Sequence, residues 1–107
     1  MPKQRQLFRI AIDRIGDLRR GNDIFTCNVV DLTEKGVRLR IDGTFRVGEE
    51  LQLRLPLTDA NLLECTIEVT HCRPPQIGAA IVRMAPDHQA RLSRFIEELN
   101  ALNMTGF

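Results

Sequence analysis

Apolar and polar residues alternate with a period of two along several stretches of the chain. In the stretches 25–29, 37–41, 51–55 and 65–71, the odd-numbered positions carry the apolar face. Because successive side chains of a β-strand point to opposite sides, this alternation is typical of strands that are buried on one side. Segments rich in Gly, Pro, Asp and Asn separate the stretches and indicate turns. The spacing predicts a small antiparallel barrel or sandwich.

The pattern changes to a helical period near the C-terminus. Pro86 suits the first turn of a helix, and Asp87 complements the positive end of the helix dipole. One apolar stripe then follows at helical spacing, formed by Leu92, Phe95, Ile96, Leu99 and Leu102. We therefore expect one domain over residues 1–107, with an N-terminal arm (1–9), a β-barrel region (10–85) and a helix (86–103) that covers one side of it.

Composition narrows the class of protein. A chain of 107 residues with 43% hydrophobic and 27% charged residues fits one ordinary globular domain. Its apolar runs are shorter than a membrane span, and its basic start lacks the apolar core of a signal peptide, so we expect no membrane insertion. Three cysteines without framework spacing favour reduced thiols, and hence a cytoplasmic location.

Charge is unevenly distributed along the chain, although the net charge is only +1. Residues 1–20 carry six basic and two acidic side chains, a local charge of +4, whereas the rest of the chain is slightly acidic. A basic arm on a slightly acidic body favours an anionic partner that binds locally over a long polyanion wrapped around the protein.

Two short sequence motifs, called strings below, contain the candidate ligand-binding residues. Arg5 and Arg9 place two guanidinium groups four residues apart near the N-terminus. Each planar fork suits a phosphate or the O6/N7 edge of guanine. Asp31, Thr33 and Gly36 lie within six residues at a break between two strand-like stretches. The Asp31 carboxylate can accept hydrogen bonds from the N1–H and N2–H₂ groups of guanine, so the two strings together suit a guanine nucleotide.

Each string also has a purely structural explanation. A solvated basic N-terminus is common, and two arginines four residues apart often occur by chance. Asp and Thr side chains stabilise turns by bonding nearby backbone amides, and Gly supplies positive φ. The two interpretations of the second string are compatible, because a turn that fixes its own backbone also holds Asp31 rigidly toward a ligand. Gly36 would also let a ring approach the chain closely.

The two strings, in this order, resemble the PilZ domain family, whose pattern is RxxxR followed by (D/N)xSxxG. Residues 10–13, residues 36–41 and the closing helix also fall where that family has them, so the resemblance covers nearly the whole chain. Thr33 stands where the family usually has serine and keeps the hydroxyl. Lys3 and Gln4 occupy places that often carry consecutive arginines, which removes positive charge and would lower affinity.

The resemblance implies a mainly β fold: a six- or seven-stranded antiparallel β-barrel with a C-terminal α-helix packed on it. It also implies a receptor for the bacterial second messenger cyclic di-GMP, with no further cofactor. Arg5 and Arg9 would then hold phosphates and guanine acceptor edges, while Asp31 and Thr33 hold a guanine donor edge. The arm before residue 10 would be mobile without ligand and would fold over it. That ordering would signal to an unidentified partner protein of pilus, flagellar or exopolysaccharide machinery.

Three further residues are weaker candidates for the ligand site. Asn28 lies in the strand that enters the Asp31 turn and would add an amide. His71 ends the alternation of Cys65, Ile67 and Val69, which makes it either a core-edge histidine or, as the family resemblance suggests, a ring that stacks on a purine. Arg73 would add a guanidinium fork or a cation–π contact.

Two other functions compete with nucleotide binding. Some PilZ domains act through partners without nucleotide, as interaction modules of motility systems. A nucleic-acid-binding barrel would use Arg38, Arg40 and Arg54, but the near-neutral charge and the lack of Tyr and Trp argue against DNA or RNA. Those three arginines, with Glu68, are better interpreted as solvated sheet surface. The sequence shows neither a metal-ligand spacing among its cysteines nor a nucleophile beside a base, so we expect no metal site and no enzyme.

Overall fold

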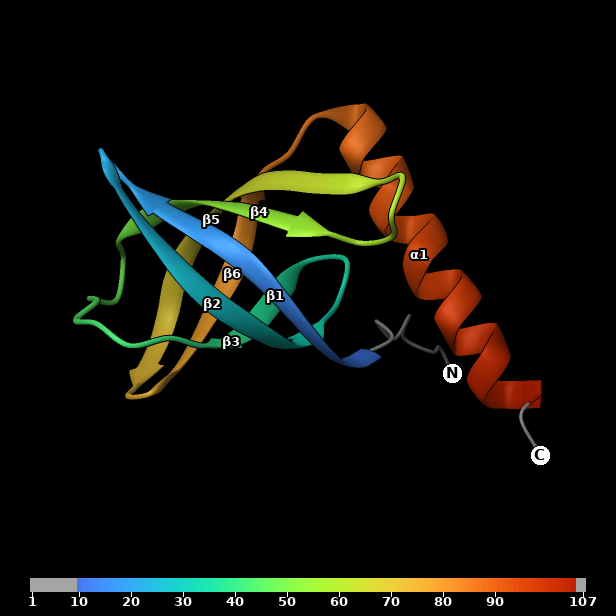
Figure 1. The fold of residues 1–107 in the computed structure, drawn as a ribbon, viewed down its shortest axis with the longest axis horizontal. Helices are drawn as coiled ribbons and strands as arrows, with labels where there is room; N and C mark the ends of the chain where they lie inside the picture. Colours follow the sequence, from blue (N-terminus) through green and yellow to red (C-terminus); the bar gives the residue numbers. More distant parts are fainter. Residues whose placement is uncertain (1–9, 106–107) are drawn as a thin grey trace, which may run out of the picture.

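The computed structural model describes residues 10–105, which form six strands and one C-terminal helix (Figure 1). The elements are β1 (Ile10–Arg20), β2 (Asp23–Leu32), β3 (Gly36–Arg40), β4 (Glu50–Pro56), β5 (Leu62–Arg73), β6 (Gln76–Arg83) and α1 (Pro86–Thr105). The predicted mainly β fold is confirmed, with six strands in the described part of the chain. The helix begins at Pro86 and continues to Thr105, beyond the predicted end at residue 103.

The strands close into an antiparallel barrel in the order β1-β2-β3-β6-β5-β4. β1 closes it, because it pairs with β2 along most of its length and with β4 through Asp17, Leu18 and Arg19. α1 lies at one end of the barrel and contacts β5 and β1 (Figure 1). This closure leaves the outer face of β2, β3, β6 and β5 as one continuous curved surface.

The barrel interior and the facing side of α1 share one apolar core. Cys27 and Cys65 are buried in it, as their positions on apolar faces predicted. The helix contributes Leu92, Phe95 and Ile96. Twelve residues have the largest fully buried side chains: Leu18, Val29, Leu32, Leu39, Leu51, Leu53, Leu55, Leu57, Leu63, Ile67, Leu92 and Ile96. The apolar residues of the alternating stretches therefore face the core, as expected.

Two irregularities in the strand pairing decide which side chains face outward. Between β2 and β3 the register shifts after Val29, and between β5 and β6 it shifts after Val69. An extra residue in one strand reverses the alternation beyond it. Asp31 would otherwise share the inner face with Val29, but Leu32 takes the buried position and Asp31 turns outward.

The same reversal corrects the prediction for His71. The alternation placed His71 on the face of Val69, at the edge of the core. Beyond the shift His71 is exposed instead, and Cys72 packs against the core. The core-edge interpretation of His71 is therefore wrong.

Candidate functional site

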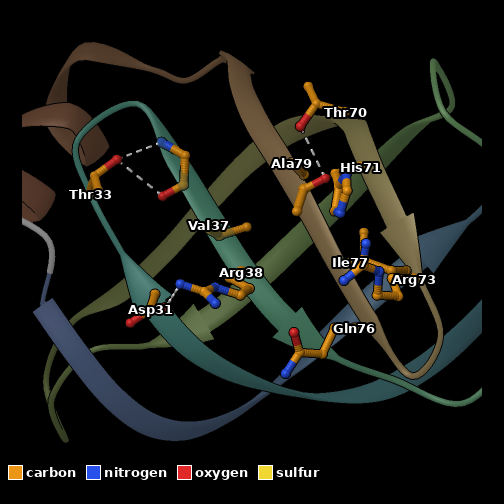
Figure 2. Close-up of a pocket in the computed structure, with 12 residues that line it drawn as sticks. Asp31, Thr33, Val37, Arg38, Thr70, His71, Arg73, Gln76, Ile77 and Ala79 are labelled. Carbon is orange, nitrogen blue, oxygen red and sulfur yellow. Dashed lines mark hydrogen bonds and ion pairs between the residues drawn. The ribbon is translucent and has the colours of Figure 1, made fainter.

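A pocket of about 450 Å³ lies on the outer face of the barrel, over β2, β3, β6 and β5 (Figure 2). Ligand pockets for small molecules commonly fall in a range of about 300–1,000 Å³. Charged side chains come from Asp31, Arg38 and Arg73, so cations exceed carboxylates. The lining residues are Asp31, Thr33, Gly36, Val37, Arg38, Thr70, His71, Arg73, Gln76, Ile77, Gly78 and Ala79.

Asp31 and Arg38 form an ion pair at one side of this pocket. They are opposite each other in the β2–β3 register, and Arg38 Nη2 contacts Asp31 Oδ2. Figure 2 shows Arg38 extending from β3 toward Asp31. The Asp31 side chain is 18% exposed and that of Arg38 is 41% exposed. From the sequence, Arg38 was expected on the solvated sheet surface or, in the competing nucleic-acid barrel, at that interface. The structure places its partly exposed side chain in the pocket wall beside Asp31.

Thr33 closes the turn between β2 and β3 with its own hydroxyl group. The backbone amides of Lys35 and Gly36 donate to Thr33 Oγ1 at 3.1 and 2.9 Å, and the hydroxyl donates to the Gly36 carbonyl oxygen at 3.3 Å. A hydroxyl has one donor and two acceptor lone pairs, so these bonds fill its capacity. The structure therefore gives Thr33 the role of fixing the turn beside Asp31.

The structure explains the glycine at position 36 differently from turn chemistry. The described glycines with positive φ are Gly21, Gly43 and Gly48, so the expectation that Gly36 supplies positive φ is wrong. A Cβ atom added at Gly36 would instead lie 2.9 Å from the carbonyl oxygen of Ala79. Gly36 is required because the turn and β6 approach each other closely.

The turn is also tied to its surroundings on two sides. The Ile81 amide of β6 donates to the Lys35 carbonyl oxygen at 2.7 Å. From α1, the Ser93 hydroxyl donates to Glu34 Oε1 at 3.2 Å. These contacts hold the segment after Asp31 against both the barrel and the helix.

β5 and β6 form the opposite side of the pocket. His71 and Arg73 of β5 line it, as the sequence analysis allowed, and both are exposed. The Thr70 hydroxyl donates to the Gly78 carbonyl oxygen at 3.2 Å at the register shift that turns His71 outward. His71 therefore presents its ring toward the pocket that Asp31 faces from the other side.

Asn28 does not join this pocket. It lines a separate open hollow of about 560 Å³, together with Ile15, Thr26 and Arg40 among others. Its Oδ1 atom is buried and makes no hydrogen bond to any described residue. The structure thus brings together Asp31, Thr33, Gly36, His71 and Arg73, and leaves Asn28 outside that group.

Two further observations concern metal ligands and membrane-spanning helices in the described part of the chain. Within residues 10–105, three or more His, Cys, Asp or Glu side chains do not gather as metal ligands would. α1 is not apolar enough over its length to cross a membrane. Arg5, Arg9 and the rest of the predicted arm (1–9) lie outside the described residues.

A comparison with protein-family models matches residues 3–98 to the PilZ domain. The chain belongs to the PilZ domain family. The match spans both strings singled out in the sequence, including Arg5 and Arg9. The comparison with curated protein sequences gives no match.

Solved structures show the same fold as this PilZ domain. The crystal structure of YcgR from Escherichia coli in complex with c-di-GMP gives a TM-score of 0.80 at 14% identity, covering 95% of this chain and 48% of that one. The Bacillus subtilis inhibitor of motility, MotI/DgrA, gives 0.78 at 16% identity, covering 94% and 52%. The isolated PilZ domain of E. coli YcgR with c-di-GMP gives 0.75 at 13% identity, covering 97% and 98%.

The share of each solved structure that this chain covers differs between whole proteins and the isolated domain. The chain spans about half the length of YcgR and of MotI/DgrA, and nearly all of the isolated YcgR domain. At identities of 13–16%, they establish the shared fold.

Proposed function

We propose that this PilZ domain is a receptor for cyclic di-GMP. The observation that carries the proposal is the outward-facing Asp31 carboxylate in the wall of a cation-rich pocket of about 450 Å³. Membership of the PilZ family supports it, as does the fold shared with a YcgR domain whose structure contains c-di-GMP. Asp31 accepts hydrogen bonds from the N1–H and N2–H₂ groups of one guanine, which adenine does not offer.

The charges of the pocket suit the rest of the ligand. Cyclic di-GMP carries two negatively charged phosphates. Arg38, Arg73 and the flat His71 ring line the pocket, and Asp31 is the one carboxylate among its described lining residues. Guanidinium groups bind phosphate oxygens through charge-assisted hydrogen bonds. His71 stacks on a base, and Arg73 contacts a phosphate or the base. Thr33 acts through the turn, because its hydroxyl is already committed to the backbone.

The N-terminal arm supplies the remaining contacts in this proposal. Arg5 and Arg9 hold phosphates and the acceptor edge of guanine, and the arm becomes ordered as they bind. Such an ordering step changes the surface that a partner meets, so it provides an output signal without any catalytic chemistry. The domain is accordingly a binding protein and not an enzyme.

The signal passes to another protein. The MotI/DgrA structure is described as an inhibitor of motility, and this supports a downstream partner in a motility system. A partner in pilus, flagellar or exopolysaccharide machinery fits the same scheme. The Ser93–Glu34 hydrogen bond gives α1 a direct contact with the turn beside the pocket, so a ligand that moves the turn also affects the helix.

Calorimetric titration with cyclic di-GMP, cyclic di-AMP, GMP and a short single-stranded RNA tests the proposal. We expect saturable binding of cyclic di-GMP at a stoichiometry of one or two per protein, and much weaker binding of the others. No binding of cyclic di-GMP would refute the receptor function and leave the interaction module as the better function. Preferential binding of RNA would instead support the nucleic-acid-binding barrel.

A further inference from the structure

The pocket contains a transverse row of four residues, one from each of four adjacent strands. Asp31 of β2 pairs with Arg38 of β3, Arg38 pairs with Gly78 of β6, and Gly78 pairs with His71 of β5. All four line the pocket. Across the outer face of the barrel, the row therefore presents a hydrogen-bond acceptor (Asp31), a donor (Arg38), a position without a side chain (Gly78) and an aromatic ring (His71).

We propose that this row reads one guanine base: the ring lies over Gly78, Asp31 binds N1–H and N2–H₂, and Arg38 binds O6. The inference rests on the receptor function proposed above and adds Arg38 and Gly78 to it as residues that determine base specificity. Neither residue belongs to the two sequence strings that first indicated the site.

The chemistry of the Asp31–Arg38 pair matches the edge of guanine. N2–H₂ and N1–H are donors and the adjacent O6 is an acceptor, so the edge presents two donor groups followed by an acceptor. A carboxylate beside a guanidinium presents acceptors followed by a donor. Arg38 engages Asp31 through one carboxylate oxygen, Oδ2, and a carboxylate accepts about four hydrogen bonds, so acceptor capacity remains for the base.

The position of Gly78 leaves room for the ring. Neighbouring strands lie about 4.8 Å apart, so the β3 and β5 backbones that carry Arg38 and His71 are roughly 10 Å apart, with only Gly78 between them. Ile77 and Ala79, on either side of Gly78 along β6, are buried, which places Gly78 on the outer face. Any larger residue there would fill the middle of the pocket.

The protein tolerates a side chain at Gly78, which makes the position a clean test. Gly78 does not have positive φ, and an added Cβ would meet its nearest neighbour, His71 Cβ, at 3.5 Å, an ordinary contact. We expect Gly78→Val to keep the melting temperature within a few degrees and to weaken cyclic di-GMP binding at least tenfold. Gly78→Ala should show the same trend to a smaller degree.

Ala80→Val is the matched control for Gly78. Ala80 lies two residues further along β6 and does not line the pocket. The affinity of Ala80→Val for cyclic di-GMP should therefore equal that of the wild type. Normal binding by Gly78→Val would overturn the placement of the ring.

Base analogues test the role of Arg38. Cyclic di-IMP keeps O6 and N1–H but lacks N2–H₂, whereas a 2-aminopurine analogue keeps N2–H₂ and lacks both O6 and N1–H. Arg38→Gln should weaken cyclic di-GMP and cyclic di-IMP by about tenfold, the effect of one lost guanine contact, and leave the 2-aminopurine analogue unchanged. Arg40→Gln changes the same residue type two positions along β3, outside the pocket, and should bind all three normally.

The outcomes separate this inference from the receptor function. If wild-type protein binds no cyclic di-GMP, the receptor function itself fails. If the wild type binds but Arg38→Gln loses all three ligands equally, Arg38 positions Asp31 or binds a phosphate that all three ligands share, and the O6 contact is refuted. Unchanged binding of all three ligands by Arg38→Gln would refute both roles.

Discussion

The hydroxyl of Thr33 and the backbone of Gly36 bond to each other in both directions. The Gly36 amide donates to Thr33 Oγ1 at 2.9 Å, and the hydroxyl donates back to the Gly36 carbonyl oxygen at 3.3 Å. The Thr33 amide donates to the same carbonyl oxygen at 2.9 Å. The Thr33 side chain therefore helps to fix the turn, together with the backbone bonds and the contacts to β6 and α1, and the position of Asp31 beside it depends on that side chain indirectly.

Thr33→Val should lower the free energy of unfolding by about 1–2 kcal/mol, because it removes the hydroxyl and leaves part-buried backbone groups without a partner. Thr33→Ser keeps the hydroxyl and should stay close to the wild type in urea denaturation. Cyclic di-GMP affinity should follow the same order. If Thr33→Val retains full stability but loses binding, the hydroxyl contacts the ligand directly and the turn role is wrong.

Gly36→Ala should destabilise the domain by about 1–3 kcal/mol, the usual range for a forced contact in a packed region. The added Cβ would lie 2.9 Å from the Ala79 carbonyl oxygen, so either the turn or β6 must shift. Gly78→Ala is the control, because its Cβ has only an ordinary 3.5 Å contact. Equal melting temperatures for the two variants would contradict the close approach as the reason for glycine at position 36.

Asp31→Ala should weaken guanine ligands selectively. The carboxylate accepts from N1–H and N2–H₂, so cyclic di-GMP should lose at least tenfold in affinity, while the weak binding of cyclic di-AMP changes little. The variant also frees Arg38 from its ion pair. Calorimetry with both ligands checks the prediction, and an equal loss for both would mean that Asp31 serves only the turn.

Arg9→Ala should reduce cyclic di-GMP affinity by tenfold or more, because a charge-assisted bidentate contact is worth roughly 1.5–3 kcal/mol. Arg9 should matter at least as much as Arg5, since it directly precedes β1. Arg9→Lys keeps the charge without the planar fork and should recover only part of the loss. Arg46→Ala, in the exposed segment before β4, is the control for a lost surface cation. Unchanged affinity in Arg9→Ala would mean that the site does not use the arm.

Local patterns in the sequence predicted the strands that alternate cleanly, but not those that lack a full apolar row. β1 buries Gly16, where an added Cβ would lie 2.7 Å from the Arg54 carbonyl oxygen, whereas Arg14 is exposed and its guanidinium lies 5.6 Å from the Phe95 ring centroid. A glycine does not indicate a buried position, and an arginine does not indicate contact with a distant aromatic ring. Their places are set by β4 and α1, which are distant in sequence.

The candidate site shows a similar limit. Asp31, Thr33 and Gly36 are close in sequence and form a recognisable string, so they could be predicted. Arg38 and Gly78 could not, because their pairing depends on the β2–β3 and β3–β6 registers. His71 was assigned to the wrong face because a register shift at one residue reverses every side chain after it.

The buried thiols predict how stability depends on alkaline pH. Burial raises the pKa of Cys65 to about 12 and that of Cys27 to about 11, where Asp17 also raises it and a hydrogen bond from the Gly16 backbone partly opposes the shift. An unfolded chain would ionise its thiols near a pKa of about 8.5.

Above that pH the unfolded state releases protons that the folded state retains. The contribution of these two thiols to the free energy of unfolding should therefore be constant below about pH 8.5 and should fall as the pH approaches about 11 to 12. The chain has no tyrosine, so phenol groups do not contribute to this slope. Urea denaturation under reducing conditions at pH 7.5, 9 and 10 measures it. Cys65→Ala should be less stable than the wild type at pH 7.5 but should lose less stability between pH 7.5 and 10. Parallel profiles for the two proteins would show that the Cys65 thiol does not control the alkaline loss of stability.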